Sequence, residues 1–451
     1  MLTTTPISAP TTAAPCLWRT AAPALKAVED PSWEVATVNA GRLGGGVGPV
    51  AVCLSSSEVS AGVRSGVSGR WLVLTAGMGA GHDQVAGELA SRIRDRGDRV
   101  LVVDLLDVLP AGVGRGLRGG YAGMLRAAPW LYESIFWLFF HEHRFGQPGV
   151  YPLDVLAAQL LRPIIQRYRP YVVVSTFHLA AQVAGRMRQR GQLAASSVVV
   201  VTEPAAHVLW LHPKTDLFIC PYQWVAAAAR EQTGRPACTP GPVVAQRFRR
   251  PGNQARGRRS MELGAGEDAV LVSAGSWGVG EVEITARLLT KLDGIRPVVL
   301  CGHNEQLRHR IASLPGCRAL GWRDDLPDLF AASAVLVDQS GGSTCAEAFA
   351  AGVPVVTHRP LPGHGRLGVR ALAEAGLVSA ASDGSALLAA VDGLRRPGRR
   401  REEQLSRAAA VFVQDPAEVL MRWAATGQLD QSVSDGIRPG PDGSLADARG
   451  S

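Results

Sequence analysis

Lysine is almost absent from this chain of 451 residues. Only three of its 47 basic residues are lysines, and the rest are arginines. The chain has 39 acidic residues, so its formal net charge is +8, a moderate excess that favours anionic partners such as nucleotides or acidic lipids. A solvated arginine surface explains the same excess without any partner, so the charge alone does not identify a function.

Cysteine pairs are also missing. The seven cysteines are odd in number, and none is spaced as C-x-x-C. This excludes a disulfide framework and a zinc site of the usual spacing, and it favours a reducing, cytoplasmic location. The motif Asp-x-Asp, which holds a metal-bound diphosphate in one class of sugar transferases, does not occur either.

Long hydrophobic runs are absent as well. The longest run, residues 130–140, is interrupted by Glu133 and Ser134 and falls short of the ~20 apolar residues that a membrane span needs. No basic residue precedes Arg19, and no apolar segment follows it, so we expect no secretory signal. Residues 1–69 lack a sustained period and are predicted to be a disordered extension.

The remaining composition is that of a folded protein, with 46% apolar and 19% charged residues. Residues 71–75 form an apolar run, residues 77–82 (GMGAGH) a glycine-rich loop, and Val85, Leu89 and Ile93 recur every fourth residue. This pattern predicts a strand, a loop and a helix over 83–96, followed by a strand at 99–104. Further strands are expected at 171–175, 197–201 and 217–220, and helices at 153–168 and 178–190.

The alternation breaks at residues 243–262, where arginines lie among proline and glycine. It restarts with strands expected at 269–274, 297–301, 318–320, 334–337 and 354–357 and with helices between them. The sequence thus predicts an α/β protein of two doubly wound, Rossmann-like domains, residues 70–242 and 263–395, joined by a linker over 243–262. Helices are expected over 396–426, the last of them over 402–423, and a disordered tail over 427–451. Ligands should bind in the cleft between the domains.

The segment 338–344 (DQSGGST) joins a predicted strand to a predicted helix. Glycines let the backbone approach a ligand, and the helix start presents free N–H groups, so Gly341, Gly342, Ser343 and Thr344 form a candidate diphosphate cradle. Glu347 follows one helical turn later, where a carboxylate could hold ribose hydroxyls. An ordinary strand-to-helix turn is the alternative for this segment alone.

Residues 341–347 (GGSTCAE), followed by 352–356 (GVPVV), resemble the nucleotide-sugar half of GT-B glycosyltransferases of the monogalactosyldiacylglycerol-synthase and MurG-like branch. The resemblance covers roughly residues 71–380 and implies the GT-B fold, two Rossmann-like domains facing across a cleft. Residues 321–330 resemble the turn whose backbone meets the uracil, and residues 360–365 resemble the loop that holds sugar hydroxyls. The implied nucleotide-sugar contacts beyond the cradle and Glu347 are Gly275, Ser276, Gly302, Trp322, Arg323 and His364.

Three positions depart from that family. Gln339 stands where the family often has lysine, His364 and Gly365 stand where Gln-Glu is common, and Gly368 replaces an asparagine. These departures leave the donor sugar open. In the first half, residues 77–82 resemble the acceptor loop that ends in histidine, and residues 202–212 resemble a second acceptor segment. The implied acceptor contacts are Gly79, Gly81, His178, Glu203, His207 and Trp210.

These residues predict a mechanism without a metal or other cofactor. Helix starts and backbone N–H groups would stabilise the leaving UDP, and His82 would be the general base, because histidine suits proton transfer near pH 7. Direct attack on the anomeric carbon inverts its configuration. A polar residue near the start of the first helix is the alternative role for His82.

Aromatic residues are concentrated in residues 121–145, with arginines on either side. Such a segment suits contact with an anionic membrane surface, and a buried helix is the alternative. The expected membrane contacts are Trp130, Phe136, Trp137, Phe139 and Phe140.

We therefore expect an inverting, metal-independent glycosyltransferase that moves a hexose from a UDP-sugar to a diacylglycerol-like or other hydrophobic acceptor. We expect it in the cytoplasm, peripheral at the inner face of the membrane, with no nucleic-acid partner. The alternatives are transfer to a soluble aglycone, a sugar-nucleotide epimerase, and an inactive UDP-sugar-binding protein. A nicotinamide enzyme is a weaker one, suggested by the glycine loop and by Asp104 about 23 residues beyond it.

Overall fold

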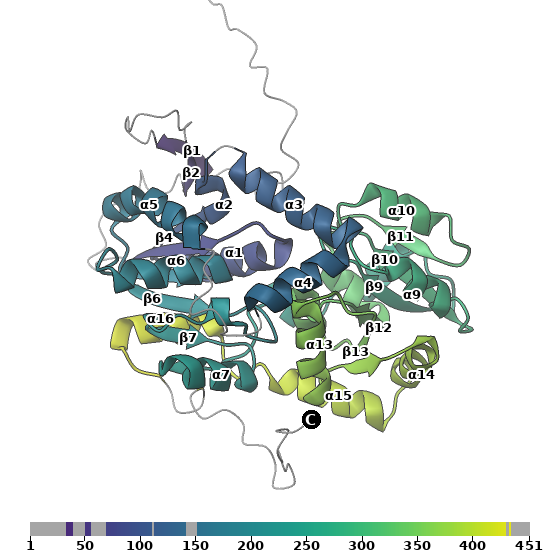
Figure 1. The fold of residues 1–451 in the computed structure, drawn as a ribbon. Coiled ribbons are helices and arrows are strands. Elements are labelled where there is room, and N and C mark those ends of the chain that lie inside the picture. The colour runs from purple at the N-terminus through teal and green to yellow at the C-terminus, as the bar shows by residue number, and fades with distance from the viewer. Residues whose placement is uncertain are drawn as a thin grey trace, which may run out of the picture.

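The computed structural model describes residues 33–38, 50–55, 69–110, 112–140, 151–429 and 433. Two six-stranded parallel sheets, each with helices on both faces, form the framework of this part of the chain (Figure 1). The two-sheet α/β fold predicted from the sequence is confirmed. No helix in these ranges is long and apolar enough to cross a membrane.

The first sheet is built from residues 70–238. Its strands are β3 (Arg70–Thr75), β4 (Arg99–Asp104), β5 (Val172–Ser175), β6 (Ser196–Val200), β7 (Leu217–Ile219) and β8 (Ala237–Cys238), in the order β4-β3-β5-β6-β7-β8. Side chains alternate between hydrophobic clusters on the two faces of the sheet, so the strands are buried on both faces. The covering helices are α1 (Ala80–Asp95), α5 (Tyr151–Tyr168), α6 (His178–Gln189) and α7 (Gln223–Thr233).

The second sheet is built from residues 268–381. Its strands are β9 (Asp268–Ser273), β10 (Ile295–Leu300), β11 (Arg318–Leu320), β12 (Ser333–Asp338), β13 (Val355–His358) and β14 (Ser379–Ala381), in the order β11-β10-β9-β12-β13-β14. The helices of this half are α9 (Val282–Leu289), α10 (Glu305–Ala312), α11 (Leu326–Ala331), α12 (Ser343–Ala350), α13 (His364–Glu374) and α14 (Gly384–Arg395).

The strand order of each sheet reverses at one point. The reversal lies between β3 and β5 in the first sheet and between β9 and β12 in the second. At such a point the loops leave neighbouring strands toward opposite faces, and a crevice opens at the carboxyl ends of those strands. The two glycine-rich segments predicted to bind ligands follow β3 and β12, so both lie at these reversals.

Several elements differ from the prediction. The helix expected over 402–423 is two helices, α15 (Arg399–Ala410) and α16 (Pro416–Thr426). Pro416 has no N–H to continue a helix but is tolerated in a first turn, where Asp415 caps the new helix through the N–H of Ala417 at 2.8 Å. Strands β8 and β14 and helix α7 were not predicted from the sequence.

The segment predicted as a linker carries two short elements, η4 (Gln246–Arg249) and α8 (Gln254–Ser260). In the extension predicted as disordered, β1 (Trp33–Val38) and β2 (Val50–Ser55) pair as an antiparallel hairpin, which corrects the prediction for those residues. The rest of residues 1–68 and nearly all of the predicted C-terminal tail lie outside the described residues.

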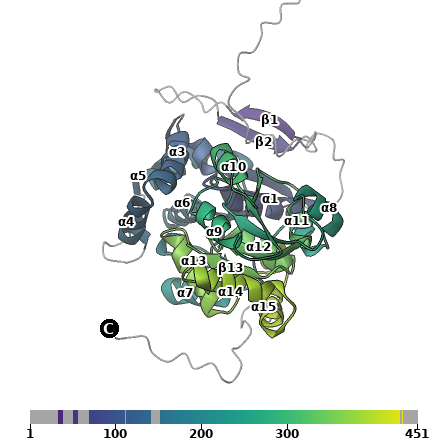
Figure 2. The same cartoon turned by 90° about the vertical axis from the view of Figure 1, so that its right-hand side faces the viewer.

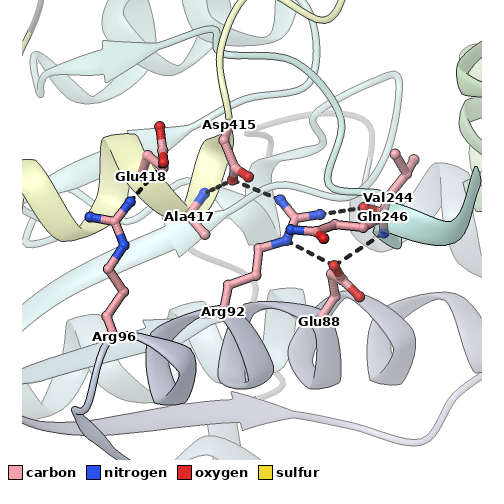
Figure 3. Close-up of polar contacts among 8 residues, drawn as sticks. All are labelled: Glu88, Arg92, Arg96, Val244, Gln246, Asp415, Ala417 and Glu418. Carbon is pink, nitrogen blue, oxygen red and sulfur yellow. Dashed lines mark hydrogen bonds and ion pairs between the residues drawn. The ribbon is translucent and has the colours of Figure 1, made fainter. Parts of the chain in front are cut away.

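The chain returns to the first half at its C-terminal end, where α16 lies beside the first sheet (Figure 1). Figure 3 shows the contacts that hold it there. Arg92 of α1, 6% exposed, binds Asp415 at 2.7 Å, Glu88 at 2.8 Å and the carbonyl oxygen of Val244 at 2.6 Å. One buried guanidinium thus joins the first domain, the segment between the sheets and the start of α16.

A pair of helices extends from the first half toward the second. It lies between β4 and β5 in the chain and consists of α3 (Val113–Ala127) and α4 (Pro129–Phe140), preceded by the short α2 (Leu105–Val108). Figures 1 and 2 both show α4 beside α13 of the second half.

Candidate active site

One cavity of about 260 Å³ lies where the carboxyl ends of the two sheets face each other. Its walls include the loops that follow β3, β9 and β12, which are the loops at the two strand-order reversals. Fourteen of the residues predicted to form the site line this cavity: Gly79, Gly81, His82, Glu203, Gly275, Ser276, Gly302, Trp322, Arg323, Gly342, Ser343, Thr344, Glu347 and His364.

The two halves touch at the edge of this cavity. The N–H of Ala80 donates to the hydroxyl oxygen of Ser276 at 3.2 Å. A Cβ atom on Gly81 would lie 2.7 Å from the hydroxyl oxygen of Ser343, so only glycine fits there without a shift. Helix α1 begins at Ala80 and not at residue 83 as predicted, so Gly81 and His82 belong to its first turn, which lies directly against the predicted diphosphate turn.

Two contacts orient the ring of His82. Its Nδ1 lies 3.1 Å from the carbonyl oxygen of Thr176 and 2.9 Å from the hydroxyl oxygen of Thr202. A carbonyl oxygen can only accept, so we assign the ring proton to Nδ1, which leaves a lone pair on Nε2. Burial lowers the pKa of His82 to about 4, although the Thr176 hydrogen bond opposes this, so the ring is neutral at pH 7. Nε2 is thus able to accept a proton.

His178, His207 and Trp210, predicted as acceptor contacts, do not line the cavity but stand behind His82. The ring of Trp210 lies 6.2 Å from that of His82, and His178 lies 5.0 Å from His207. Burial lowers the pKa values of both histidines, which keeps this wall uncharged.

Glu203 lines the cavity beside that wall. Its carboxylate lies 3.5 Å from Nε2 of His207, and burial raises its pKa to about 7. A carboxyl group with a pKa near neutrality can exchange a proton at physiological pH.

The turn after β12 is shaped by Asp338. Its carboxylate accepts the N–H groups of Ser340 and Gly341, each at 2.7 Å. Gly341, at φ 65°, therefore serves the turn and does not line the cavity. Ser343 and Thr344 lie in the first turn of α12, where backbone N–H groups have no carbonyl partner within the helix. These two N–H groups can therefore bind an anion.

Glu347 lies one turn further along α12. It is 6% exposed and lines the cavity, and burial raises its pKa to about 8, which Arg247 partly offsets. The carboxyl group is thus largely protonated at pH 7 before any ligand is bound, and it can pair with hydroxyl groups that enter the cavity.

Trp322 forms the outer part of the second half's wall. Its ring stacks on that of His303 at 4.5 Å with an interplanar angle of 12°. The guanidinium of Arg323 is bound to the carboxylate of Asp325 at 2.7 Å, so it supplies no free charge to the cavity. Sequence reasoning missed His303, since the residue follows the glycine at position 302 without any motif of its own.

Helix α4 has one buried and one exposed side, so each of the two alternatives predicted for this segment holds for part of it. Phe136 is 1% exposed and packs between His207 and His364, with ring distances of 6.3 and 6.5 Å, so its predicted membrane contact is wrong. Trp130 is 70% exposed, and Leu131 is also exposed. The side chains of the other predicted contacts, Trp137, Phe139 and Phe140, lie outside the described part of the structure.

The carboxylate of Asp104 is already occupied. It accepts the N–H of Gly77 at 3.0 Å, the N–H of Leu106 at 2.8 Å and the guanidinium of Arg118 at 2.6 Å. The bonds of Asp104 and Arg118 to Gly77 fix the start of the glycine-rich segment. Asp104 is therefore not presented to a ribose, which removes the main support for a nicotinamide enzyme.

Two Rossmann-like units that enclose one cavity at their strand-order reversals define the GT-B architecture. Residues 82–237 match the family model of monogalactosyldiacylglycerol (MGDG) synthase. The chain has the GT-B architecture that the resemblance in the sequence implies, and the comparisons support a glycosyltransferase similar to the monogalactosyldiacylglycerol-synthase and MurG-like enzymes.

Individual proteins agree with this classification. A processive diacylglycerol beta-glucosyltransferase of Bacillus cereus (strain G9842) is 23% identical over 362 residues, which are 77% of this chain and 90% of that protein. MurG of Acinetobacter baumannii has the same fold, with a TM-score of 0.51 at 15% identity over 79% of this chain and 99% of MurG. UGT89C1 of Arabidopsis thaliana, complexed with UDP-L-rhamnose, gives a TM-score of 0.55 at 10% identity over 80% and 99% of the two chains.

Proposed function

We propose that this glycosyltransferase moves a hexose from a UDP-sugar to the free hydroxyl of a diacylglycerol-like lipid, with inversion at the anomeric carbon and without a metal ion. The observation that carries the proposal is the position of His82 in the first turn of α1, which contacts the predicted diphosphate turn through Gly81 and Ser343. A base and an anion site therefore face the same cavity from opposite halves.

The donor would lie along the second half. The diphosphate would be held by the first-turn N–H groups of Ser343 and Thr344 and by the positive end of α12. Glu347 would accept hydrogen bonds from the ribose hydroxyls, and the uracil ring would lie near Trp322. The sequence has no Asp-x-Asp to supply metal ligands in the usual way. We assign the neutralisation of the leaving UDP to the helix start and its N–H groups.

The acceptor would enter from the first half. Nε2 of His82 would take the proton of the acceptor hydroxyl as its oxygen attacks the anomeric carbon. The bond from that carbon to the diphosphate oxygen breaks at the same time, and its electron pair leaves with UDP. A single displacement of this kind inverts the anomeric configuration, and it needs no group from the protein other than the base and the anion site.

Two observations favour a lipid acceptor. The Bacillus cereus relative is a diacylglycerol glucosyltransferase by its name. Four exposed large apolar side chains, Val113, Leu117, Trp130 and Leu131, belong to α3 and α4, and the arginines at positions 115 and 126 are exposed on the same helices. Exposed apolar side chains together with arginines on the same helices fit contact with an anionic membrane face. We therefore place the protein in the cytoplasm, peripheral at the inner side of the membrane.

A UDP-release assay tests the function. Purified protein is given one UDP-hexose at a time, with vesicles that contain diacylglycerol or with vesicles that lack it. We expect release of UDP and formation of a glycolipid only when donor and diacylglycerol are both present. Release with a soluble aglycone alone, conversion of the donor without any acceptor, or UDP binding without turnover under every condition would each contradict the proposal.

The membrane contact has its own prediction. Replacing Trp130 with alanine should lower the fraction of protein that sediments with anionic vesicles at low salt, with a partition coefficient about tenfold smaller, because a large apolar side chain no longer enters the interface. Ile284→Ala, which removes an exposed apolar side chain from α9, is the matched control and should bind as the wild type does. If wild-type protein stays in the supernatant, the membrane contact does not exist.

A further inference from the structure

Helix α4 of the acceptor half docks on the donor half through contacts on both sides of Tyr132. Arg126, at the end of α3, donates to the carbonyl oxygen of Trp277 at 2.9 Å. Glu133 pairs with Arg366 of α13 at 3.0 Å. Figures 1 and 2 show the same arrangement, with α4 beside α13 in both views. Tyr132 of the first half therefore contacts the loop at residues 360–365 of the second half, which is the loop predicted to hold sugar hydroxyls.

The fit between α4 and that loop is close. A Cβ atom on Gly363 would lie 2.8 Å from the ring of Tyr132 and 2.9 Å from the ring of Phe136. Gly363 also has φ 68°, a conformation that other residues rarely adopt. The loop residue before His364 can therefore only be glycine while α4 is docked, and the position of His364 depends on α4.

Tyr132 and His364 form a short hydrogen bond across this junction. The phenol oxygen lies 2.6 Å from Nδ1 of the imidazole. Burial raises the pKa of Tyr132 far above its ordinary value and lowers the pKa of His364 to about 4, so both groups are neutral at pH 7. The phenol of Tyr132 is also hydrogen-bonded to the phenol of Tyr121, which can donate to it. The direction of the bond between Tyr132 and His364 decides which ring nitrogen of His364 carries its proton.

The chemistry of the two groups favours the phenol as donor. A neutral phenol is a stronger hydrogen-bond donor than a neutral imidazole N–H, and an imidazole nitrogen is a stronger acceptor than a phenol oxygen. If Tyr132 donates to Nδ1, the proton of the imidazole must be on Nε2. His364 lines the cavity as the first residue of α13, so that N–H would join the other donors of a helix start.

We propose that Tyr132 is a positioning residue for the donor sugar: it fixes His364 in the tautomer that presents an Nε2–H group to a hydroxyl oxygen of the bound hexose. The inference rests on the proposed function in that the donor is a UDP-hexose. A residue of the acceptor half would thus contribute to recognition of the donor sugar. Donor recognition is then complete only while α4 is docked across the cleft.

Tyr132→Phe tests the proposal, because it keeps the ring packing and removes only the hydroxyl. Titration calorimetry with UDP-glucose and with UDP compares the two ligands, which differ by the hexose. We expect the Kd for UDP-glucose to rise about tenfold, the usual effect of one lost hydrogen bond, and the Kd for UDP to stay within about twofold. In turnover, the KM for the donor should rise more than kcat falls.

Glu133→Gln is the matched control, since it breaks the neighbouring ion pair between the same helices and leaves the phenol in place. Its Kd for UDP-glucose should stay within about twofold of the wild-type value. An equal loss in both variants would show that docking alone matters, and an unchanged Kd in Tyr132→Phe would also overturn the proposal.

The tautomer can be observed without any donor. In ¹H–¹⁵N spectra of the histidine rings, assigned with His364→Gln, the wild-type ring of His364 should carry its proton on Nε2, and Tyr132→Phe should change that pattern. A proton on Nδ1 in the wild type would overturn the proposal. Because this measurement and the binding of UDP-glucose need no acceptor, they remain informative if no acceptor supports turnover and the proposed transfer itself is wrong.

Discussion

Replacing His82 with alanine should lower kcat for transfer by about 10²–10⁴-fold, the usual contribution of a general base, and leave the Kd for UDP within about twofold. The imidazole is the only titratable ring in the glycine-rich segment at residues 77–82, and its Nε2 keeps a lone pair because Nδ1 donates to the Thr176 carbonyl oxygen. The diphosphate site belongs to the other half, so UDP binding does not depend on the ring. UDP release and UDP calorimetry measure the two effects.

Two further variants separate base catalysis from other roles of His82. His82→Gln keeps a hydrogen-bond donor near Thr176 but has no basic nitrogen, and it should be as inactive as the alanine variant. His309→Ala, which removes an exposed histidine from α10, should be fully active. Recovered turnover in His82→Gln would mean that the ring orients the loop and takes no proton.

The pH profile follows from the same residue. Since the pKa of His82 is lowered to about 4, the ring is unprotonated above about pH 5. The decline of kcat/KM that protonation of the base causes should therefore lie near pH 4 and not near the ordinary histidine value of 6.5. Residual activity of His82→Ala should lack this decline.

Replacing Glu347 with glutamine should weaken UDP binding and stabilise the protein at alkaline pH. Above about pH 8, where the carboxyl group of Glu347 is ionised, ribose hydroxyls would lose a carboxylate partner in the variant, for which we expect a Kd for UDP about tenfold higher. The same substitution should raise the free energy of unfolding at alkaline pH. The pKa of Glu347 is raised to about 8 in the folded protein, whereas the unfolded chain has an ordinary value near 4.5. Between these values the folded protein binds more protons than the unfolded chain, so wild-type stability falls as pH rises through this range.

Glutamine has the size of glutamate but cannot ionise, so this loss disappears in the variant. At pH 8 the variant should be more stable than the wild type by at least about 1 kcal/mol, and at pH 4.5 the two should be close. Thermal unfolding at both pH values measures the difference. Glu374→Gln, an exposed glutamate on α13, should show neither effect. A variant that is less stable than the wild type at pH 8 would show that the carboxylate is charged and well paired in the folded protein.

A residue that lowers the stability of the fold but strengthens ligand binding is typical of binding sites. A carboxyl group that is buried before its ligand arrives destabilises the fold, and the ligand's hydroxyl groups supply the missing partners. Glu347 and Glu203 both have pKa values raised by burial, and both line the cavity between the sheets. We therefore expect bound donor and acceptor to stabilise the protein most strongly at alkaline pH.

The sequence by itself determined the α/β architecture and the glycine-rich turns. Parallel strands are buried on both faces, so they are continuous apolar runs such as residues 71–75 and 334–337, which a local pattern reveals. Glycine turns are also local, because Gly341 is required by its own backbone conformation. The short edge strands β8 and β14 escaped prediction because two or three residues carry no period.

Only the tertiary structure decided which of these parts meet. Helix α4 is apolar on nearly every side, so its sequence could not show that Phe136 faces the cleft and Trp130 faces solvent. The contact between Tyr132 and His364 joins residues 232 positions apart, and that between Gly81 and Ser343 joins the two domains. Local patterns report the environment of a segment, whereas contacts across the cleft depend on how two separately folded sheets are docked, which no single segment encodes.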